Sequence, residues 1–319
     1  MDNSIENEAL VRAFIGLQLA GAFSFLLMVG SALVLKSVKR HAIWFSFCIS
    51  WIIFGLSYTL LSFAGRQFST PSFGLCVTQA ALVYSAPPLA GCTSLSLVSH
   101  LLLSIITALS QSAVKTSHKQ FIRALVILPW LIWIAITIAF LVFGIRHADD
   151  VRLSFNGTYC LLVNTPISKV TSVFATAASV LIISAEVMIG VLLFKYRAIV
   201  DIFSQSVTMA IRIVIFTFLG MTAIVMGLVF TLTEQRGIQY DIVVAMLPPG
   251  TAFIFGTQLD LLYGWTCWRR RQDVGITSGT VLSLGTISHP LTSTNSSFFE
   301  SASIPRAPNS TPVTEKMFV

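Results

Sequence analysis

Three ionisable side chains inside long apolar segments offer the most chemistry in this sequence. They are His100, Glu186 and Asp260, and each is surrounded by hydrophobic residues. An ionisable group at membrane depth costs on the order of several kcal/mol unless it is paired or hydrated, so it is a functional candidate by default. All three should fall in the cytoplasmic halves of their helices, where they could meet in one inner polar cluster. Such a cluster can act as a switch that re-pairs when helices shift, or as a proton relay. The structural alternative is hydrogen bonding to Ser and Thr on neighbouring helices, with snorkelling towards the interface.

Motifs for catalysis and cofactor binding are absent from the sequence. It contains neither H-E-x-x-H nor G-x-S-x-G, which argues against a metalloprotease and an α/β-hydrolase. Proteolysis inside a membrane by paired aspartates needs two, and Asp260 stands alone. A retinal pigment needs a lysine in the last apolar segment, and 242–264 has none. We therefore expect no enzyme activity, no cofactor and no metal.

The composition is that of a membrane protein. Of 319 residues, 55% are hydrophobic and 10% are charged, whereas a soluble domain carries roughly a quarter charged residues. The net charge of +7 falls in short clusters between apolar runs. This pattern is typical of membrane topology and not of a nucleic-acid-binding face.

Seven apolar runs are long enough to span a bilayer, which takes about 20 residues in a helix. They cover 10–35, 42–64, 77–110, 121–145, 167–194, 211–233 and 242–264. The first has acidic residues ahead of it and is too long for a signal-peptide core. The sequence thus predicts an all-α membrane protein, a seven-transmembrane helix bundle over 10–271, preceded by a short segment at 1–9.

The distribution of Lys and Arg predicts the orientation. With the N-terminus outside, fourteen of the twenty basic residues lie on the cytoplasmic side, as the positive-inside rule requires. Asn156-Gly157-Thr158, a glycosylation sequon, then lies on the outer face. Cys76 and Cys160 lie on that side too, in an oxidising compartment. We expect an extracellular N-terminus and a cytoplasmic C-terminus.

Prolines interrupt two of the predicted helices. Pro87 and Pro88 lie in the third, Pro248 and Pro249 in the seventh. A proline inside a helix removes a hydrogen bond and bends the axis, so both helices should bend in their outer halves and act as hinges. In a transporter built from two three-helix repeats, matching interruptions of this kind instead indicate the transport site.

A ligand pocket is expected in the outer half of the bundle, where fixed charges are few. Pockets between helices are mostly apolar with a few placed polar groups, and aromatic residues near outer helix ends also form the interfacial belt. This setting favours a hydrophobic or weakly polar ligand. The candidates are Tyr58, Gln79, Tyr84, Thr171, Thr231 and Tyr240.

The C-terminal segment differs from the rest. Aromatic and basic residues at 265–271 should bind anionic lipid at the inner leaflet, and Cys267 there is a candidate for palmitoylation. Residues 272–319 contain sixteen Ser or Thr and should form a disordered cytoplasmic tail open to phosphorylation.

The two outer cysteines carry a resemblance to a known family. A cysteine at the top of the third helix and another in the second outer loop, on seven helices with an outer N-terminus, resemble G-protein-coupled receptors. Asp260-Leu261-Leu262-Tyr263 is similar to that family's Asn/Asp-Pro-x-x-Tyr motif without the proline, and the run 255–260 is similar to orphan receptors of mushroom-forming fungi. The acidic-Arg-aromatic triplet of rhodopsin-like receptors is missing.

The resemblance implies a Cys76–Cys160 disulfide and a switch role for Tyr263 beside Asp260. It implies a plasma-membrane receptor that senses an extracellular small or lipophilic ligand and couples to a heterotrimeric G protein. The alternative is a small-molecule or lipid transporter that uses His100, Glu186 and Asp260 along its path.

Overall fold

The computed structural model describes residues 2–34, 40–110, 115–154, 157–163, 167–195, 210–222, 225 and 238–257. All of these belong to one unit of the chain, which ends at Gly264. Several predictions lie outside the described residues: those for Asn156, Thr231, Asp260, Tyr263, Cys267 and the tail at 272–319. Tyr240 belongs to a described helix, but its side chain also lies outside the described part.

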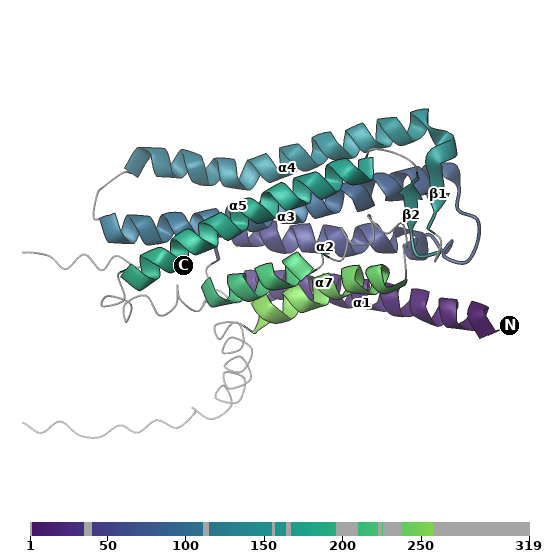
Figure 1. Cartoon of the computed structure of the whole chain (residues 1–319), viewed down its shortest axis with the longest axis horizontal. Helices are drawn as coiled ribbons and strands as arrows, with labels where there is room; N and C mark the ends of the chain where they lie inside the picture. Colours follow the sequence, from purple (N-terminus) through teal and green to yellow (C-terminus); the bar gives the residue numbers. More distant parts are fainter. Residues whose placement is uncertain are drawn as a thin grey trace, which may run out of the picture. The chain divides into compact units, whose positions relative to one another are not determined.

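Long helices make up most of the described chain (Figure 1). They are α1 (Asp2–Val34), α2 (Ala42–Phe63), α3 (Phe73–Ser110), α4 (Lys115–Arg146), α5 (Ile167–Lys195) and α7 (Ile238–Gly256). A further helix covers Ala210–Thr222. Helices are expected for apolar segments in lipid, because every backbone polar group must then be bonded within the protein.

Five of these helices, α1 to α5, are long and apolar enough to cross a membrane. Ala210–Thr222 and Asp241–Gly256 are apolar but shorter over the described residues. The prediction of a largely helical chain with apolar helices long enough to span a membrane is therefore confirmed for five helices, and these coincide with the first five predicted spans.

The helices extend beyond the apolar runs that predicted them. α1 begins at Asp2, so it includes most of the segment predicted as a separate N-terminus, and α4 begins at Lys115, six residues before the predicted start at 121. The reason is that helical hydrogen bonding continues through polar residues, whereas hydropathy marks only the part that suits lipid. α3 and α7 remain helical through their proline pairs.

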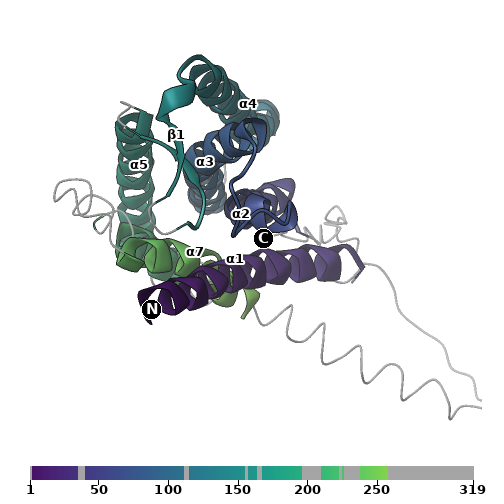
Figure 2. The same ribbon diagram turned by 90° about the vertical axis from the view of Figure 1, so that its right-hand side faces the viewer.

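The bundle is organised around α3 and α1. α3 packs against α2, α4 and α5, and α1 packs against α2 and α7 (Figures 1 and 2). A buried aromatic cluster joins α1, α2, the helix at Ala210–Thr222 and α7, with ring centroids 4.8 to 6.3 Å apart. Its members are Phe25, Phe47, Trp51, Phe216 and Phe255.

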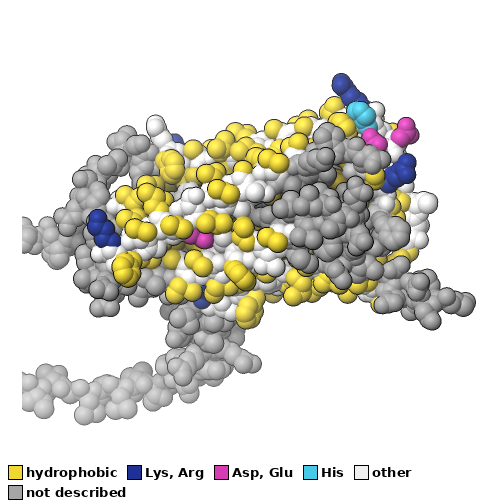
Figure 3. Space-filling view, viewed as in Figure 1, with side chains coloured by type: hydrophobic (Ala, Val, Ile, Leu, Met, Phe, Trp, Pro, Cys, Tyr) yellow, Lys and Arg dark blue, Asp and Glu magenta, His cyan; other side chains and the backbone are white. Residues whose placement is uncertain are grey.

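Apolar side chains also cover much of the outward-facing surface. Large hydrophobic residues along α4 and α5 are exposed, and Figure 3 shows the visible described face covered by them, with charged groups mostly near the two ends. A soluble monomer rarely exposes so large an apolar area. This surface is therefore suited to contact with lipid.

One small sheet departs from the all-α prediction. β1 (Val151–Leu153) and β2 (Cys160–Leu162) pair antiparallel, with Leu153 opposite Cys160. Strands of three residues are too short to give a recognisable alternation, and an isolated hairpin is marginally stable. We call β1, β2 and the described residues between them the hairpin. The end of the bundle that carries it, where α1 begins and α2 ends, is the hairpin end.

Candidate functional site

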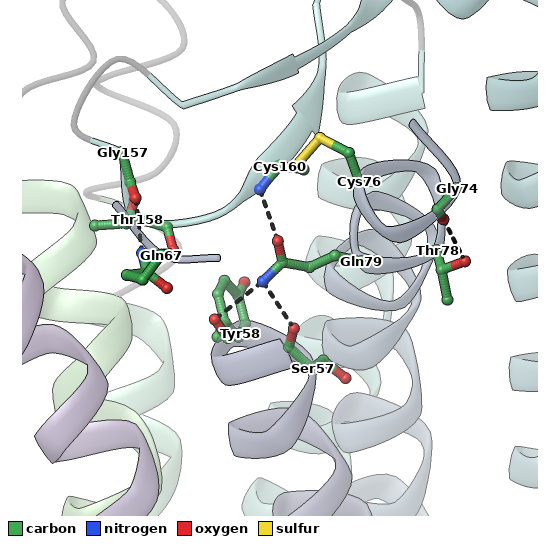
Figure 4. The surroundings of a disulfide bond; sticks show 10 residues. All are labelled: Ser57, Tyr58, Gln67, Gly74, Cys76, Thr78, Gln79, Gly157, Thr158 and Cys160. Atoms are coloured by element: carbon green, nitrogen blue, oxygen red, sulfur yellow. Dashed lines mark hydrogen bonds between the residues drawn. A yellow bond between two sulfur atoms is a disulfide. The ribbon is translucent and has the colours of Figure 1, made fainter. Parts of the chain in front are cut away.

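A disulfide attaches the hairpin to the bundle. Cys76 in the first turn of α3 is bonded to Cys160 at the start of β2, with 5.3 Å between the Cα atoms (Figure 4). Both residues are buried. The pairing that the family resemblance implied is therefore confirmed in the structure. Because Cys160 directly follows Tyr159, the disulfide also fixes the main chain next to this tyrosine.

Gln79 reinforces this attachment from the next turn of α3. Its Oε1 accepts a hydrogen bond from the backbone N–H of Cys160 at 3.0 Å, and its Nε2 donates to the carbonyl of Tyr58 at 3.2 Å (Figure 4). The side chain is fully buried, where leaving such groups unpaired would be costly. Gln79, predicted as a pocket candidate, thus positions the hairpin against α2 and α3.

Gln67 holds the other side of the hairpin. This residue lies in the connection between α2 and α3, and its Nε2 donates to the carbonyls of Gly157 at 2.7 Å and Thr158 at 3.0 Å (Figure 4). Gly157 has a φ of +69°, in the left-handed region that glycine adopts readily. The main chain on both sides of Tyr159 is therefore fixed by side chains from the bundle.

The hairpin also bonds to α7 through a buried carboxylate. Asp241, 4% exposed, accepts from Thr158 Oγ1 and from Tyr159 Oη, each at 3.1 Å. Hydrogen bonds to an ionised carboxylate are among the stronger ones in proteins. Asp241 is not among the candidates singled out from the sequence. Its place in the first turn of an apolar helix was the signal that could have singled it out.

Aromatic side chains enclose the ring of Tyr159. Phe14 of α1 stacks on it, with 5.9 Å between centroids and 27° between planes, and Tyr58 of α2 meets it edge-on at 5.1 Å and 88°. Phe14, Tyr58, Tyr159 and Asp241 are called the Tyr159 site below. Of these, Tyr58 alone was predicted from the sequence as a pocket residue. No feature of the sequence distinguishes Phe14 and Tyr159 from other core and loop aromatics.

Two other pocket candidates, Thr171 and Tyr84, lie together where α5 meets α3. Thr171 of α5 donates to the backbone carbonyl of Tyr84 at 3.4 Å, and Tyr84 Oη donates to the carbonyl of Leu162 at 3.3 Å. The ring of Tyr84 packs against Phe140 of α4. The predicted candidates therefore separate into a group beside α3 and α5 and the Tyr159 site near α1, α2 and α7.

The predicted inner switch residues have different partners. The ring of His100 stacks on that of His41, which precedes α2, with centroids 4.6 Å apart. Glu186 of α5 accepts a hydrogen bond from Thr217. The structure thus assigns His100 to the contact between α2 and α3, and Glu186 to that between α5 and the helix at Ala210–Thr222.

Arg212 forms a contact that the sequence analysis missed. Its guanidinium donates to the carbonyl of Ile254 at 2.9 Å and to that of Thr257 at 2.6 Å. The last carbonyls of a helix have no partner within it and carry partial negative charge, so a cation there is favourable. The helix at Ala210–Thr222 is thereby bonded to α5 through Thr217 and to the end of α7 through Arg212.

The predicted hinge in α7 packs directly on α1. A Cβ placed on Gly21 would lie 2.3 Å from Pro248 Cβ and 2.8 Å from Pro249 N, so only glycine fits there. One turn away, Gln18 is fully buried and its Nε2 donates to the carbonyl of Val244 at 3.4 Å. Close approach over small residues is the usual means of packing helices in membranes.

Comparison with protein-family models and with curated proteins finds no match. The site is therefore interpreted from its own geometry, which combines a disulfide-anchored hairpin, an aromatic enclosure and one buried carboxylate.

Proposed function

We propose that this chain is a seven-helix plasma-membrane receptor whose hairpin end faces outside and whose opposite end couples to a heterotrimeric G protein. In this proposal the two shorter helices, at Ala210–Thr222 and Ile238–Gly256, belong to the sixth and seventh spans. The ligand is a small or lipophilic molecule that enters from the hairpin end.

The observation that carries the proposal is the attachment of the hairpin to separate parts of the bundle. Cys160 is bonded to α3, and Tyr159 contacts α1, α2 and α7. A molecule that moved Tyr159 would change contacts on three helices at once. A ligand shifts an equilibrium only when it binds one arrangement better than the other, and a ligand that displaced Tyr159 would favour an arrangement without these contacts.

A connection to the opposite end is also available. α7 begins beside the hairpin at Asp241 and ends at the carbonyls bonded by Arg212. Because a helix transmits displacement along its length, a shift at Asp241 would alter the position of the helix at Ala210–Thr222. Movement of that helix would change the surface presented to a G protein.

The test is to reconstitute the full-length chain in lipid nanodiscs with purified heterotrimeric G proteins and to measure nucleotide exchange. The expected result is exchange above that of empty nanodiscs for at least one Gα class. The transporter alternative is measured in parallel, in proteoliposomes that contain a pH-sensitive dye. Proton-coupled flux that Asp260→Asn abolishes, without any stimulated exchange, would overturn the receptor proposal.

A further inference from the structure

The side chain of Tyr159 is held in the way that a small aromatic ligand would be held. Its ring stacks on Phe14 and meets Tyr58 edge-on, its hydroxyl donates to Asp241, and the residue is 9% exposed. Offset stacking and edge-to-face contact are the preferred aromatic geometries. A mostly apolar enclosure with one placed polar group is typical of a small-molecule site.

The main chain on both sides of Tyr159 is held by contacts that do not involve its ring. Gln67 bonds the carbonyls before Tyr159, and the disulfide and Gln79 hold Cys160 after it. Rotation about the Cα–Cβ bond of Tyr159 would therefore move the ring and leave the main chain in place. A tethered side chain of this kind competes with a free ligand at high effective concentration.

We propose that the Tyr159 site binds a small phenol or aryl alcohol, and that Tyr159 is a displaceable occupant of this site. The carboxylate of Asp241 accepts the hydroxyl of the ligand, and Phe14 and Tyr58 contact its ring. The inference rests on the proposed receptor function, for which it names the ligand class. Asp241 sets the specificity, because an aromatic hydrocarbon of the same size would leave its Oδ1 without the donor that Tyr159 supplies, while Thr158 still donates to Oδ2.

The competition predicts how variants bind a free phenol. The measured affinity for a ligand equals the intrinsic affinity multiplied by the fraction of protein whose site is open. A side chain that occupies the site most of the time therefore lowers the measured affinity. Tyr159→Phe keeps the ring but loses the hydrogen bond to Asp241, so the side chain becomes a weaker competitor. We expect 4-ethylphenol to bind this variant roughly tenfold more tightly than the wild type, from the usual strength of a hydrogen bond to a charged group.

The matched control is Tyr84→Phe. This substitution also removes a tyrosine hydroxyl from a hydrogen bond, here a part-buried one, but that hydroxyl donates to the carbonyl of Leu162, the last residue of β2, and not to Asp241. We expect its affinity for 4-ethylphenol to equal that of the wild type. Ethylbenzene, which lacks the hydroxyl, should bind Tyr159→Phe roughly tenfold more weakly than 4-ethylphenol.

The experiment uses the full-length chain in nanodiscs of one lipid composition, with saturable binding followed by ligand-observed NMR. Tyr159→Ala should bind most tightly of all, and if it fails to fold, the pair Tyr159→Phe and Tyr84→Phe carries the test. Two results would overturn the proposal. One is equal affinity in wild type and Tyr159→Phe, and the other is binding of ethylbenzene as tight as that of 4-ethylphenol.

Nucleotide exchange in the same nanodiscs separates this inference from the proposed function. Variant-dependent binding of 4-ethylphenol without any nucleotide exchange would support the Tyr159 site and contradict the proposed receptor function. Nucleotide exchange that rises in an Arg212 variant, without binding of 4-ethylphenol, would contradict the Tyr159 site as a phenol site and support the proposed receptor function.

Discussion

Single residues at the hairpin end explain how an apolar bundle holds polar groups. Among the residues that the structure describes, Asp241 is the one buried carboxylate, and it has two hydroxyl donors. Gln67 and Gln79 similarly donate to main-chain carbonyls. The positions of these polar residues were only partly predictable from the sequence. Tyr58 and Gln79 were expected at the outer end from hydropathy, but the donors and acceptors that they meet come from distant segments.

Gly21 offers a test at the residue scale. In Gly21→Ala the new methyl group would collide with Pro248, so α1 and α7 must separate. We expect destabilisation of about 1–3 kcal/mol, the usual cost of overpacking, seen as a lower midpoint of thermal unfolding in detergent. Gly30→Ala is the matched control, because it lies in the same helix and a Cβ there meets nothing within 4 Å. Equal midpoints for the two variants would contradict the close packing of α1 on α7.

Gln79 offers a second test. Gln79→Leu leaves the N–H of Cys160 and the carbonyl of Tyr58 without this partner, which should cost about 1–3 kcal/mol for each buried group left unpaired. The exposed neighbour Thr78 bonds only within its own helix, to Gly74, so Thr78→Val should stay close to wild type in thermal unfolding. An unchanged midpoint for Gln79→Leu would show that Gln79 does not anchor the hairpin.

At the scale of elements, the hairpin depends on its disulfide. Cys76 and Cys160 are 84 residues apart, and closing a loop of that length stabilises the folded state by about 4–5 kcal/mol in the chain-entropy model. Cys76→Ser and Cys160→Ser should each reduce surface expression strongly. The double variant should be no worse than either single one, because both remove the same bond. Additive losses would indicate separate roles for the two residues.

The helix at Ala210–Thr222 is the second element with a testable role. Arg212→Ala removes two hydrogen bonds from a cation to the end of α7, so the packing of these two helices seen in the structure should be destabilised. If the proposed function holds, basal nucleotide exchange should rise at least about tenfold, because the loss of even one of these two hydrogen bonds from a charged group has an effect of that size. Arg212→Lys should lie in between, because lysine lacks the planar fork.

Arg146→Ala is the control for this prediction. Arg146 is an exposed arginine in the last turn of α4, at the hairpin end, so its removal should leave basal exchange unchanged. Exchange that is insensitive to Arg212→Ala, in a preparation that does exchange nucleotide, would contradict a restraining role for this contact.

At the scale of the whole molecule, orientation can be measured directly. Loop charge predicts an extracellular N-terminus, so an N-terminal epitope tag should be accessible on intact cells and a C-terminal tag only after permeabilisation. A glycosidase-sensitive mass shift should be lost in Asn156→Gln and retained in Asn295→Gln and Asn309→Gln, whose sequons lie in the tail. The reverse pattern would place the hairpin end in the cytoplasm.

Hydropathy determined from the sequence alone that the chain is largely helical, where its first five long helices lie and that their surfaces suit lipid. This was possible because transfer into a bilayer is a sum over the residues of one segment. The tertiary structure decided the rest: Tyr159 within an aromatic enclosure, Asp241 beneath the hairpin, Glu186 with Thr217, and Arg212 at the end of α7. Tyr159 and Asp241 are 82 residues apart, and Arg212 and Thr257 are 45 apart. A hydrogen bond depends on distances of about 3 Å between such partners, and only the packed bundle sets those distances.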